Sequence, residues 1–411
     1  MDNTKPLAPL RGKANPLRTI HFSFAGYLLL LCLTVATESG LVKALANAAA
    51  IGIFIVAAVN WAFYKSHTKV QTDQILSLTL LYIGIFGSTA INFRSSEVVD
   101  VIKIAIAPSF IIIGTSLAVD ISKWSMKERS TKLLFWALIL LPLLAILIQL
   151  LTGSRDFSEN KQIGFFANRN NAGLYAICLL SFYCVLTDKP FASPILYMCV
   201  GLMFGTLGLF LAVVLALFLS ISRAAHLVMG IVLIASTLIL VSFFPEVGSK
   251  LRIKPVIDSI VLLASGRIDL ETVTYADLVR LLNTQDLSFL FRLKHWYNLF
   301  NIYIDGNFSN YLFGFGAGSS VALSTINLVP HNDYIRVIFE FGFIAFLGFI
   351  GLLVSVVRSI PRGWTLTPIL VVVVYFFSEN LINNYLAMIL FFLSAGVLAT
   401  RSRMEIDTNQ S

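Results

Sequence analysis

The residues best suited to chemistry lie at the start of one hydrophobic run, in the segment Pro330–Gly342. This segment contains a histidine (His331), an asparagine (Asn332), an arginine (Arg336) and two carboxylates. Ionisable residues at the edge of a membrane helix are costly unless they are solvated or paired, so their presence indicates a functional site. A structural alternative stays open at this point: Asn332 or Asp333 caps the helix, while His331 and Arg336 lie among lipid headgroups.

Two further arginines lie in polar segments that are distant in the sequence. Arg169 stands within the asparagine-rich stretch 168–171, and Arg292 precedes Trp296 by four residues. A guanidinium group matches the oxygens of a pyrophosphate and stays charged, and a histidine that titrates near neutrality can take a proton from a hydroxyl. The arginines together with His331 therefore suit a lipid-linked pyrophosphate sugar as substrate.

Each of these residues also has a purely structural interpretation. Arg292 would equally fit the surface of an amphipathic helix, and Arg169 would fit an interfacial position from which it reaches the headgroups. Arg336 lies five residues after His331, off the same helix face, so its predicted role is electrostatic rather than directly catalytic. Glu340 is placed to pair with Arg336 at i, i+4.

Composition indicates an all-α polytopic membrane protein. Of the 411 residues, 57% are apolar and only 13% are charged, about half the charged fraction of a soluble domain. The net charge of +8 follows membrane topology, so no nucleic-acid partner is expected. The four cysteines all lie in apolar runs and show neither a disulfide framework nor metal-ligand spacing. No metal and no cofactor is predicted.

The number of membrane spans depends on one long apolar run, 192–221, which counts as one helix or, split at Gly205–Gly208, as two. The choice gives eleven or twelve spans. Lysines and arginines gather on the cytoplasmic side of membrane proteins. Only twelve spans with an inside N-terminus place Arg358, Arg362 and the other short basic segments on that side. The other apolar runs lie near 22–37, 44–64, 75–93, 101–119, 133–151, 172–187, 226–244, 332–357, 365–379 and 383–400.

This arrangement predicts five regions. They are a cytoplasmic tail over 1–21, transmembrane helices 1–9 over 22–244, a large periplasmic loop over 245–330, transmembrane helices 10–12 over 331–400 and a cytoplasmic tail over 401–411.

The large loop is expected to fold into amphipathic helices that lie on the outer leaflet or cover the membrane bundle. Apolar residues recur at helical spacing over 258–264, 275–282 and, most strongly, 288–303. Asp305–Asn307 is a turn signal. The glycine-rich Gly314–Gly318 lacks the Lys-Ser/Thr ending of a phosphate-binding loop. It predicts a tight backbone approach just before the His331 helix.

The order of these motifs resembles the O-antigen ligase and O-antigen polymerase superfamily over roughly residues 160–350. The features that carry the resemblance are His331-Asn332 followed after nine residues by Gly342, Arg292 with Trp296, the segment Gly314–Gly318, and Asn168–Asn171 at the start of a helix. The spacing from His331-Asn332 to Gly342 favours a ligase, whereas Ala345 weakens that choice over a polymerase, because ligases tend to have Gly, Thr or Tyr there.

The resemblance implies a GT-C-like membrane glycosyltransferase in the bacterial inner membrane, with a metal-independent site that faces the periplasm. The donor would be an undecaprenyl-pyrophosphate-linked glycan, and the acceptor a lipid A-core sugar or a growing glycan. His331 would be the base on the acceptor hydroxyl, and Arg292 would hold the leaving pyrophosphate. Arg169, Asn332 and Arg336 would bind substrate.

At one motif this sequence departs from the pattern of the superfamily. Members often carry Ser/Thr-Arg-Gly at an outer helix end, and Gly205–Gly208 occupies that place in the topology with leucine instead of arginine. Ser222-Arg223-Ala224 fits better in sequence, but the charge count places it on the cytoplasmic face. Arg223 is therefore a site residue only if this segment is periplasmic. Otherwise Arg169 supplies the second cation.

Two other classes of protein stay open. A transporter of lipid-linked oligosaccharides predicts ionisable residues near the bilayer midplane and broken helices in repeated positions, whereas here the polar residues gather at one face. A membrane-anchored scaffold would not require a cluster of basic residues at one outward-facing opening of the membrane bundle. Convergence of Arg292, His331 and Arg169 on one outward cavity would favour the enzyme.

Overall fold

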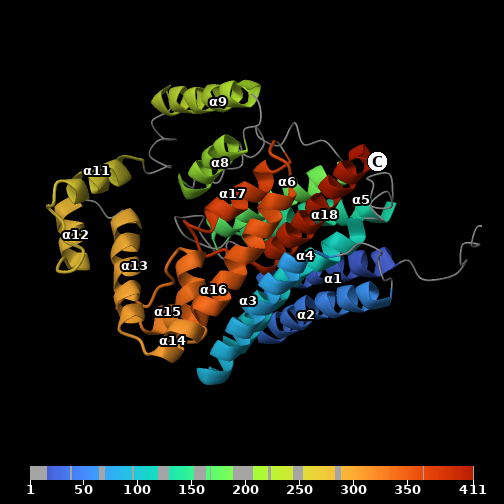
Figure 1. The fold of residues 1–411 in the computed structure, drawn as a ribbon, viewed down its shortest axis with the longest axis horizontal. Coiled ribbons are helices and arrows are strands. Elements are labelled where there is room, and N and C mark those ends of the chain that lie inside the picture. The colour runs from blue at the N-terminus through green and yellow to red at the C-terminus, as the bar shows by residue number, and fades with distance from the viewer. Residues whose placement is uncertain are drawn as a thin grey trace, which may run out of the picture.

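The computed structural model describes residues 16–37, 39–63, 70–94, 97–118, 129–151, 163–166, 168–187, 207–220, 224–243, 253–282, 288–363 and 365–410. Over these residues the fold is all-α, as expected, and β pairing is limited to one bridge between Ile163 and Phe166. The helices (Figure 1) are α1 (Pro16–Thr37), α2 (Gly40–Phe63), α3 (Thr72–Ile91), α4 (Val98–Leu117), α5 (Arg129–Leu151), α6 (Arg169–Thr187), α8 (Leu207–Leu219), α9 (Ala224–Phe243), α11 (Ile253–Ala264), α12 (Tyr275–Leu282), α13 (Ser288–Ile304), α14 (Phe308–Phe313), α15 (Ser319–Ala322), α16 (Asp333–Ser359), α17 (Thr367–Tyr375) and α18 (Tyr385–Gln410).

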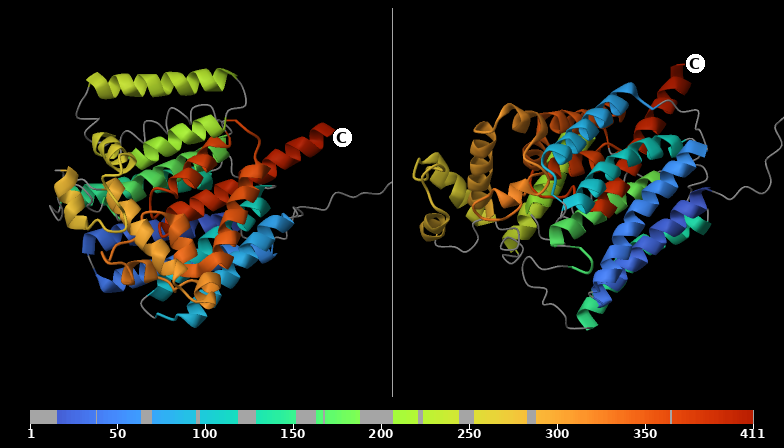
Figure 2. Two further views of the ribbon diagram at one scale, coloured as in Figure 1. Left: turned by 60° about the vertical axis from the view of Figure 1, so that its left-hand side comes forward. Right: turned by 90° about the horizontal axis from the view of Figure 1, so that it is seen from below.

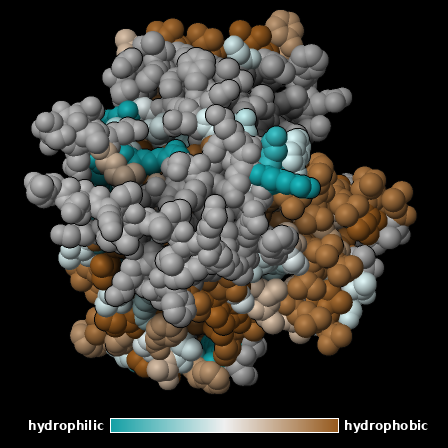
Figure 3. Space-filling view, turned by 90° about the vertical axis from the view of Figure 1, so that its right-hand side faces the viewer, coloured by the Kyte–Doolittle hydropathy of each residue, from teal (hydrophilic) through white to brown (hydrophobic). Residues whose placement is uncertain are grey.

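Seven of the described helices are long and apolar enough to cross a membrane: α2, α3, α4, α5, α6, α16 and α18. Shorter apolar segments lie in α1 and α8, at Ser23–Val35 and Gly208–Leu219. Many large apolar side chains on these helices are exposed, among them Leu41, Phe86 and Leu151, and Figure 3 shows apolar surface over much of the described part of one side. Soluble proteins rarely expose so much contiguous apolar surface. The chain is a multi-pass membrane protein.

Helices from opposite ends of the sequence form the core of the bundle, because α16 packs against α3 and α18 packs against α4 (Figure 1). Small residues at these crossings let the backbones approach closely. A Cβ added to Gly84 would lie 2.5 Å from the Cβ of Ala345, and one added to Gly396 would lie 2.2 Å from the carbonyl oxygen of Ile111. The two pairs therefore form a tight scaffold that fixes the N-terminal ends of α16 and α18.

Helix α16 is kinked at Gly342, whose backbone is left-handed with φ +79°. The kink frees carbonyl groups that an unbroken helix would use. The glycine-rich segment Gly314–Gly318 donates hydrogen bonds to these carbonyl groups. The N–H of Phe315 donates to the backbone carbonyl of Phe339 at 2.9 Å, and the N–H of Gly316 donates to the backbone carbonyl of Glu340 at 3.0 Å. A Cβ on Gly314 would lie 2.5 Å from Glu340. The predicted tight backbone approach of this segment is confirmed, and the structure shows that the element it approaches is α16.

The helices of the long segment before α16 also match the sequence prediction closely. The predicted helices 258–264, 275–282 and 288–303 correspond to α11, α12 and α13, and the turn at 305–307 separates α13 from α14. Asn307 forms a reciprocal capping box with Asn310 at the start of α14. Figures 1 and 2 place α11–α13 beside the bundle, with α13 lying next to α16.

Two helices extend past the apolar runs that predicted them. Helix α1 begins at Pro16, and α18 continues to Gln410 through Arg401 and Arg403.

The first part of the run 192–221 lies outside the described residues, and α8 supplies the second part. The split at Gly205–Gly208 therefore falls at the edge of the described chain.

Candidate functional site

The site begins where α16 starts. Asn332 caps this helix, because its Oδ1 accepts the N–H of Ile335 at 3.1 Å. The residue before it, His331, has a left-handed backbone with φ +49°, which is uncommon for a non-glycine residue and turns the chain sharply at the helix entrance. The carbonyl of Pro330 accepts a hydrogen bond from the indole of Trp296 in α13. Helix α13 is thereby joined to the chain directly beside His331.

One carboxylate, Glu379, holds the two residues that the sequence predicts to be catalytic. Its Oε1 lies 2.8 Å from Nη2 of Arg292, and its Oε2 lies 3.1 Å from Nδ1 of His331. Arg292 also donates through Nη1 to the carbonyl of Ser378 at 2.7 Å. The side chain of Glu379 is only 7% exposed, whereas those of Arg292 and His331 are 25% and 33% exposed. The carboxylate therefore lies beneath two partners that face outward.

The charge of Glu379 is stabilised by these partners. Burial raises the pKa of this carboxyl, but the Arg292 charge, the His331 contact and a hydrogen bond from Asn170 lower it further, so the pKa is held below its ordinary value. Glu379 is therefore ionised at neutral pH. An ionised carboxylate on Nδ1 favours the imidazole tautomer with its proton on Nδ1, which leaves Nε2 free to accept a proton.

The loop that carries Glu379 is held by Asp333. Oδ2 of this residue accepts the N–H groups of Leu381 at 2.6 Å and Ile382 at 3.1 Å, and its own N–H donates to the carbonyl of Phe376 at 2.8 Å. The first turn of α16 and the α17–α18 loop are thus fixed to each other. Asp333 positions the loop, and among the described residues it forms no hydrogen bond or ion pair with the side chain of His331 or Arg292.

The asparagine-rich stretch at the start of α6 reaches the same place. Asn170 bonds to Glu379, and the backbone carbonyl of Asn171 accepts the side-chain amide of Asn384 at 2.9 Å. Arg169 is partly exposed and makes no ion pair among the residues that the structure describes. The structure therefore brings Arg292 and His331 together, and Asn170 rather than Arg169 joins them.

Neither Asn332 nor Arg336 pairs with Glu379 in the described part of the chain. Asn332 is buried and serves as the helix cap, as the structural alternative foresaw. Arg336 is 5% exposed and pairs with Glu340 at 3.2 Å, so the i, i+4 pair is confirmed and a position among headgroups is wrong.

Arg223 lies outside the described residues. Ser220, which precedes it, bonds to Thr367 at 2.8 Å, at the opposite end of α17 from Glu379.

His295 is a second histidine near the site, and it is buried. It is 2% exposed. Burial and the neighbouring His331 lower its pKa to about 4, so it is neutral at physiological pH. A neutral, buried imidazole packs the inner side of α13 and contributes no charge to the site.

Sequence reasoning missed Glu379. The residue ends the apolar run 365–379 and begins a polar segment, Ser378–Asn384, between two hydrophobic helices. A carboxylate at such a boundary is a usable signal, since membrane segments tolerate charge only with a partner. In the twelve-span arrangement this segment also falls on the same side of the membrane as His331.

Comparison with family models, curated proteins and solved structures finds no match for this chain. Within the described residues, no group of three or more His, Cys, Asp or Glu side chains could hold a metal ion. The chemistry available to the site is therefore judged from its own side chains: an oriented imidazole, a guanidinium with unused N–H donors and an ionised carboxylate that joins them.

Proposed function

We propose that this protein is a membrane glycosyltransferase that moves a glycan from an undecaprenyl-pyrophosphate donor to an acceptor hydroxyl. The proposal rests chiefly on one observation, that Glu379 binds His331 and Arg292 at once. The resemblance of the sequence motifs to O-antigen ligases and polymerases supports the same reaction and favours a lipid A-core sugar as acceptor.

In this reaction His331 is the base. Glu379 accepts the hydrogen bond from Nδ1 and holds the ring, so Nε2 takes the proton of the acceptor hydroxyl. The hydroxyl oxygen then forms a bond to the anomeric carbon of the donor sugar, and the bond from that carbon to the pyrophosphate oxygen breaks. The pyrophosphate leaves with the electron pair and its lipid.

Arg292 stabilises the leaving group. Its guanidinium is fixed by Ser378 and Glu379 through Nη1 and Nη2, and three of its five N–H donors remain for phosphate oxygens. Preorganised charge of this kind stabilises the transition state because no reorganisation is needed as negative charge develops. Asn170, which lies against Glu379, adds a neutral donor beside the pyrophosphate.

The proposal includes a topology of twelve spans in the bacterial inner membrane, with both termini in the cytoplasm. His331, the α17–α18 loop and α11–α13 then face the periplasm, where the lipid-linked donor is exposed. This topology is supported by the basic segments on the opposite side of the predicted spans. It also agrees with the meeting of the N-terminal ends of α6 and α16 with the α17–α18 loop.

The experiment that tests the function is a lipopolysaccharide gel of a deletion strain complemented with the wild-type gene or with variants. We expect wild type to restore a capped ladder, and His331→Ala and Glu379→Gln, expressed at wild-type levels, to lose the ladder while lipid-linked glycan accumulates. His226→Ala is the control, because His226 lies in α9, which packs on α8 away from the site.

Three other outcomes are informative. A phenotype limited to a single repeat unit on the core would assign the protein as a polymerase that uses the same donor. Full restoration of the ladder by His331→Ala would overturn the catalytic role of His331 and the proposed chemistry. Loss of lipid-linked glycan from the periplasmic face would indicate a transporter.

A further inference from the structure

One strongly exposed aromatic side chain lies beside the carboxylate of the candidate site. Phe377 is 57% exposed, whereas the adjacent Phe376 is fully buried and packs against Tyr334 and Phe349. Phe377 precedes Glu379 by two residues, in the loop between α17 and α18. Two neighbouring phenylalanines therefore have different environments, and the proposed function gives the outward one no role.

Trp296 connects this ring to the two outward-facing residues of the site. Phe377 lies edge-on to Trp296, with ring centroids 5.5 Å apart. The indole N–H of Trp296 donates to the carbonyl of Pro330, directly before His331. Trp296 also follows Arg292 by one turn on the same face of α13. The aromatic pair of Phe377 and Trp296 is therefore adjacent to both His331 and Arg292.

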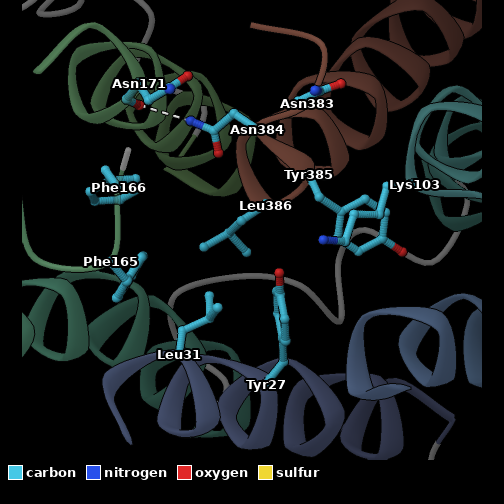
Figure 4. A pocket seen from close by; sticks show the side chains of 10 residues that line it. All are labelled: Tyr27, Leu31, Lys103, Phe165, Phe166, Asn171, Asn383, Asn384, Tyr385 and Leu386. Atoms are coloured by element: carbon cyan, nitrogen blue, oxygen red, sulfur yellow. Dashed lines mark hydrogen bonds between the residues drawn. The ribbon is translucent and has the colours of Figure 1, made fainter. Parts of the chain in front are cut away.

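The loop that carries Phe377 is held at both ends. The N–H of Phe377 donates to the carbonyl of Val374 in α17 at 3.0 Å. At the other end of the loop, the side-chain amide of Asn384 donates to the carbonyl of Asn171 in α6 at 2.9 Å (Figure 4). A side chain on a fixed loop loses little conformational freedom when a ligand binds to it.

The proposed reaction brings a sugar ring close to this pair. The acceptor hydroxyl reaches His331 and the pyrophosphate reaches Arg292, and Glu379 contacts both of these side chains. The anomeric carbon of the donor must therefore lie close to that carboxylate. Phe377 is the one strongly exposed large apolar side chain in the described segments that meet at this point, which are 288–297, 330–333 and 376–384.

The surroundings of Phe377 favour a sugar over a lipid chain as its partner. Polar groups of Arg292, His331, Ser378 and Glu379 gather in the same part of the site. A pyranose ring has an apolar face of C–H groups and a rim of hydroxyls, so it can contact an aromatic ring while its hydroxyls remain among polar groups. A hydrocarbon chain at this place would deprive these polar groups of water and give them no partner.

The charge that develops during transfer also matches an aromatic ring. Glycosidic bonds break through transition states in which the anomeric centre carries positive charge. The face of an aromatic ring attracts positive charge. An aromatic side chain next to the reacting carbon therefore stabilises the transition state as well as the bound sugar.

We propose that Phe377, supported by Trp296, is the platform on which the reacting sugar of the donor lies. The ring face of Phe377 contacts the C–H face of that sugar and stabilises the positive charge at its anomeric carbon. This assignment rests on the proposed function, because the reaction defines which sugar lies between His331 and Arg292.

The contact is tested by photo-crosslinking of the full-length protein in proteoliposomes. The photoreactive analogue p-benzoyl-phenylalanine is placed at position 377, undecaprenyl-pyrophosphate-linked glycan is the probe, and no acceptor is present. We expect irradiation to attach glycan to the protein, and the glycan to remain attached after mild acid, which cleaves the bond between sugar and pyrophosphate. The same analogue at position 308 is the matched control, because Phe308 in α14 is 75% exposed. It should capture no glycan.

The other outcomes of this experiment overturn the proposal. Glycan that mild acid releases would show that position 377 contacts the prenyl chain. Capture of phospholipid alone, or equal capture at positions 377 and 308, would show an ordinary aromatic side chain of the membrane interface. Absence of any adduct at position 377 would exclude the contact.

Kinetics separate the aromatic face from apolar bulk. Phe377→Leu is expected to lower kcat/KM for the donor about tenfold, in the range of a cation–π contact, and to leave KM for the acceptor unchanged. Phe377→Tyr should retain most of the activity. Phe308→Leu is the control, and thermal unfolding checks that each variant is folded. Equal activity of Phe377→Leu and Phe377→Tyr would overturn the role of the ring.

A failure of the proposed function gives a different result from a failure of the platform. Crosslinking requires no turnover, so acid-stable capture of glycan at position 377 would stand even if His331→Ala kept full transfer activity. Loss of activity in His331→Ala without acid-stable capture at position 377 would refute the platform alone.

Discussion

Glu379 connects residues that are far apart in the chain, since Arg292 lies 87 positions before it and His331 lies 48 before it. Its carboxylate contacts the imidazole of His331 and the guanidinium of Arg292 at the same time and fixes the orientation of both. We expect the activity of the site to depend on this carboxylate as strongly as on the histidine.

The first prediction is that Glu379→Gln lowers transfer activity by roughly 100-fold or more, the range of a general base contribution. The amide keeps the shape and can still accept from Arg292, but it offers no negative charge to stabilise His331 when that ring takes a proton. The measurement is the initial rate of transfer by protein purified at equal yield. Glu271→Gln, at an exposed position, should behave like wild type, and equal rates for the two variants would contradict the role of Glu379.

The second prediction concerns pH and His295. Its pKa is lowered from 6.5 to about 4 in the folded protein, so the unfolded chain binds a proton that the folded protein does not. The stabilising contribution is complete above pH 6.5 and is lost as the pH falls through 4, on the order of 3 kcal/mol in total. The Tm of wild type should therefore fall more steeply than that of His295→Phe between pH 7 and 4.5. Parallel curves in a thermal unfolding series would show that His295 is not responsible.

At this scale the sequence predicted part of the site. His331 and Arg292 were identified because each has a distinctive type and lies beside a motif. Glu379 was missed because its role depends on contacts across the whole C-terminal half, and Asn170 was overlooked beside the more conspicuous Arg169. Arg336 was assigned to substrate, whereas it is buried against Glu340. Residue type alone does not reveal which partner satisfies a charge.

At the scale of elements, the kink of α16 is the feature that joins the glycine-rich segment to the site helix. Gly342 adopts φ +79°, and a Cβ there would lie 2.3 Å from the carbonyl oxygen of Leu312. The backbone geometry and the close approach both require glycine. The kink sets the direction of the first part of α16, which begins directly after His331.

The third prediction is that Gly342→Ala destabilises the protein by more than about 1 kcal/mol, since alanine is strained at positive φ and the added methyl group meets main-chain atoms. Gly52→Ala is the control, because nothing lies within 4 Å of a Cβ at that position in α2. Thermal unfolding of both variants in the same detergent is the measurement. A loss of stability in Gly52→Ala that equals that in Gly342→Ala would show that the kink is not the cause.

Helix positions were predicted well, and the kink was not. The ends of α12 and α13 follow from apolar spacing and from the turn at 305–307, which are local properties of the sequence. The bend at Gly342 depends on carbonyl groups that are taken up by Phe315 and Gly316, so it is decided by contacts between segments. A glycine inside an apolar run is compatible with a straight helix. Whether the helix bends there is decided by the residues that contact the glycine in the folded protein.

For the whole molecule, sidedness is the property that the proposed function needs. The fourth prediction is that Ser265→Cys reacts with a membrane-impermeant maleimide from the periplasm, whereas Arg362→Cys reacts only after lysis. Both positions are exposed, and they lie on opposite sides in the twelve-span arrangement. The wild-type chain, whose cysteines lie in apolar runs, is the background control. Labelling of both variants from the same side would exclude twelve spans.

The pairing of α3 with α16 has a consequence for biosynthesis. About 240 residues separate the end of α3 from the start of α16, and at roughly 5–20 residues per second the ribosome needs tens of seconds to make them. During that time Gln71, which finally bonds to Ser355 and Ser359, lacks these partners, and Gly84 of α3 lacks its contact with Ala345. The first half of the protein must therefore wait in the membrane as an incomplete intermediate, and a chain truncated before α16 is expected to be degraded rapidly.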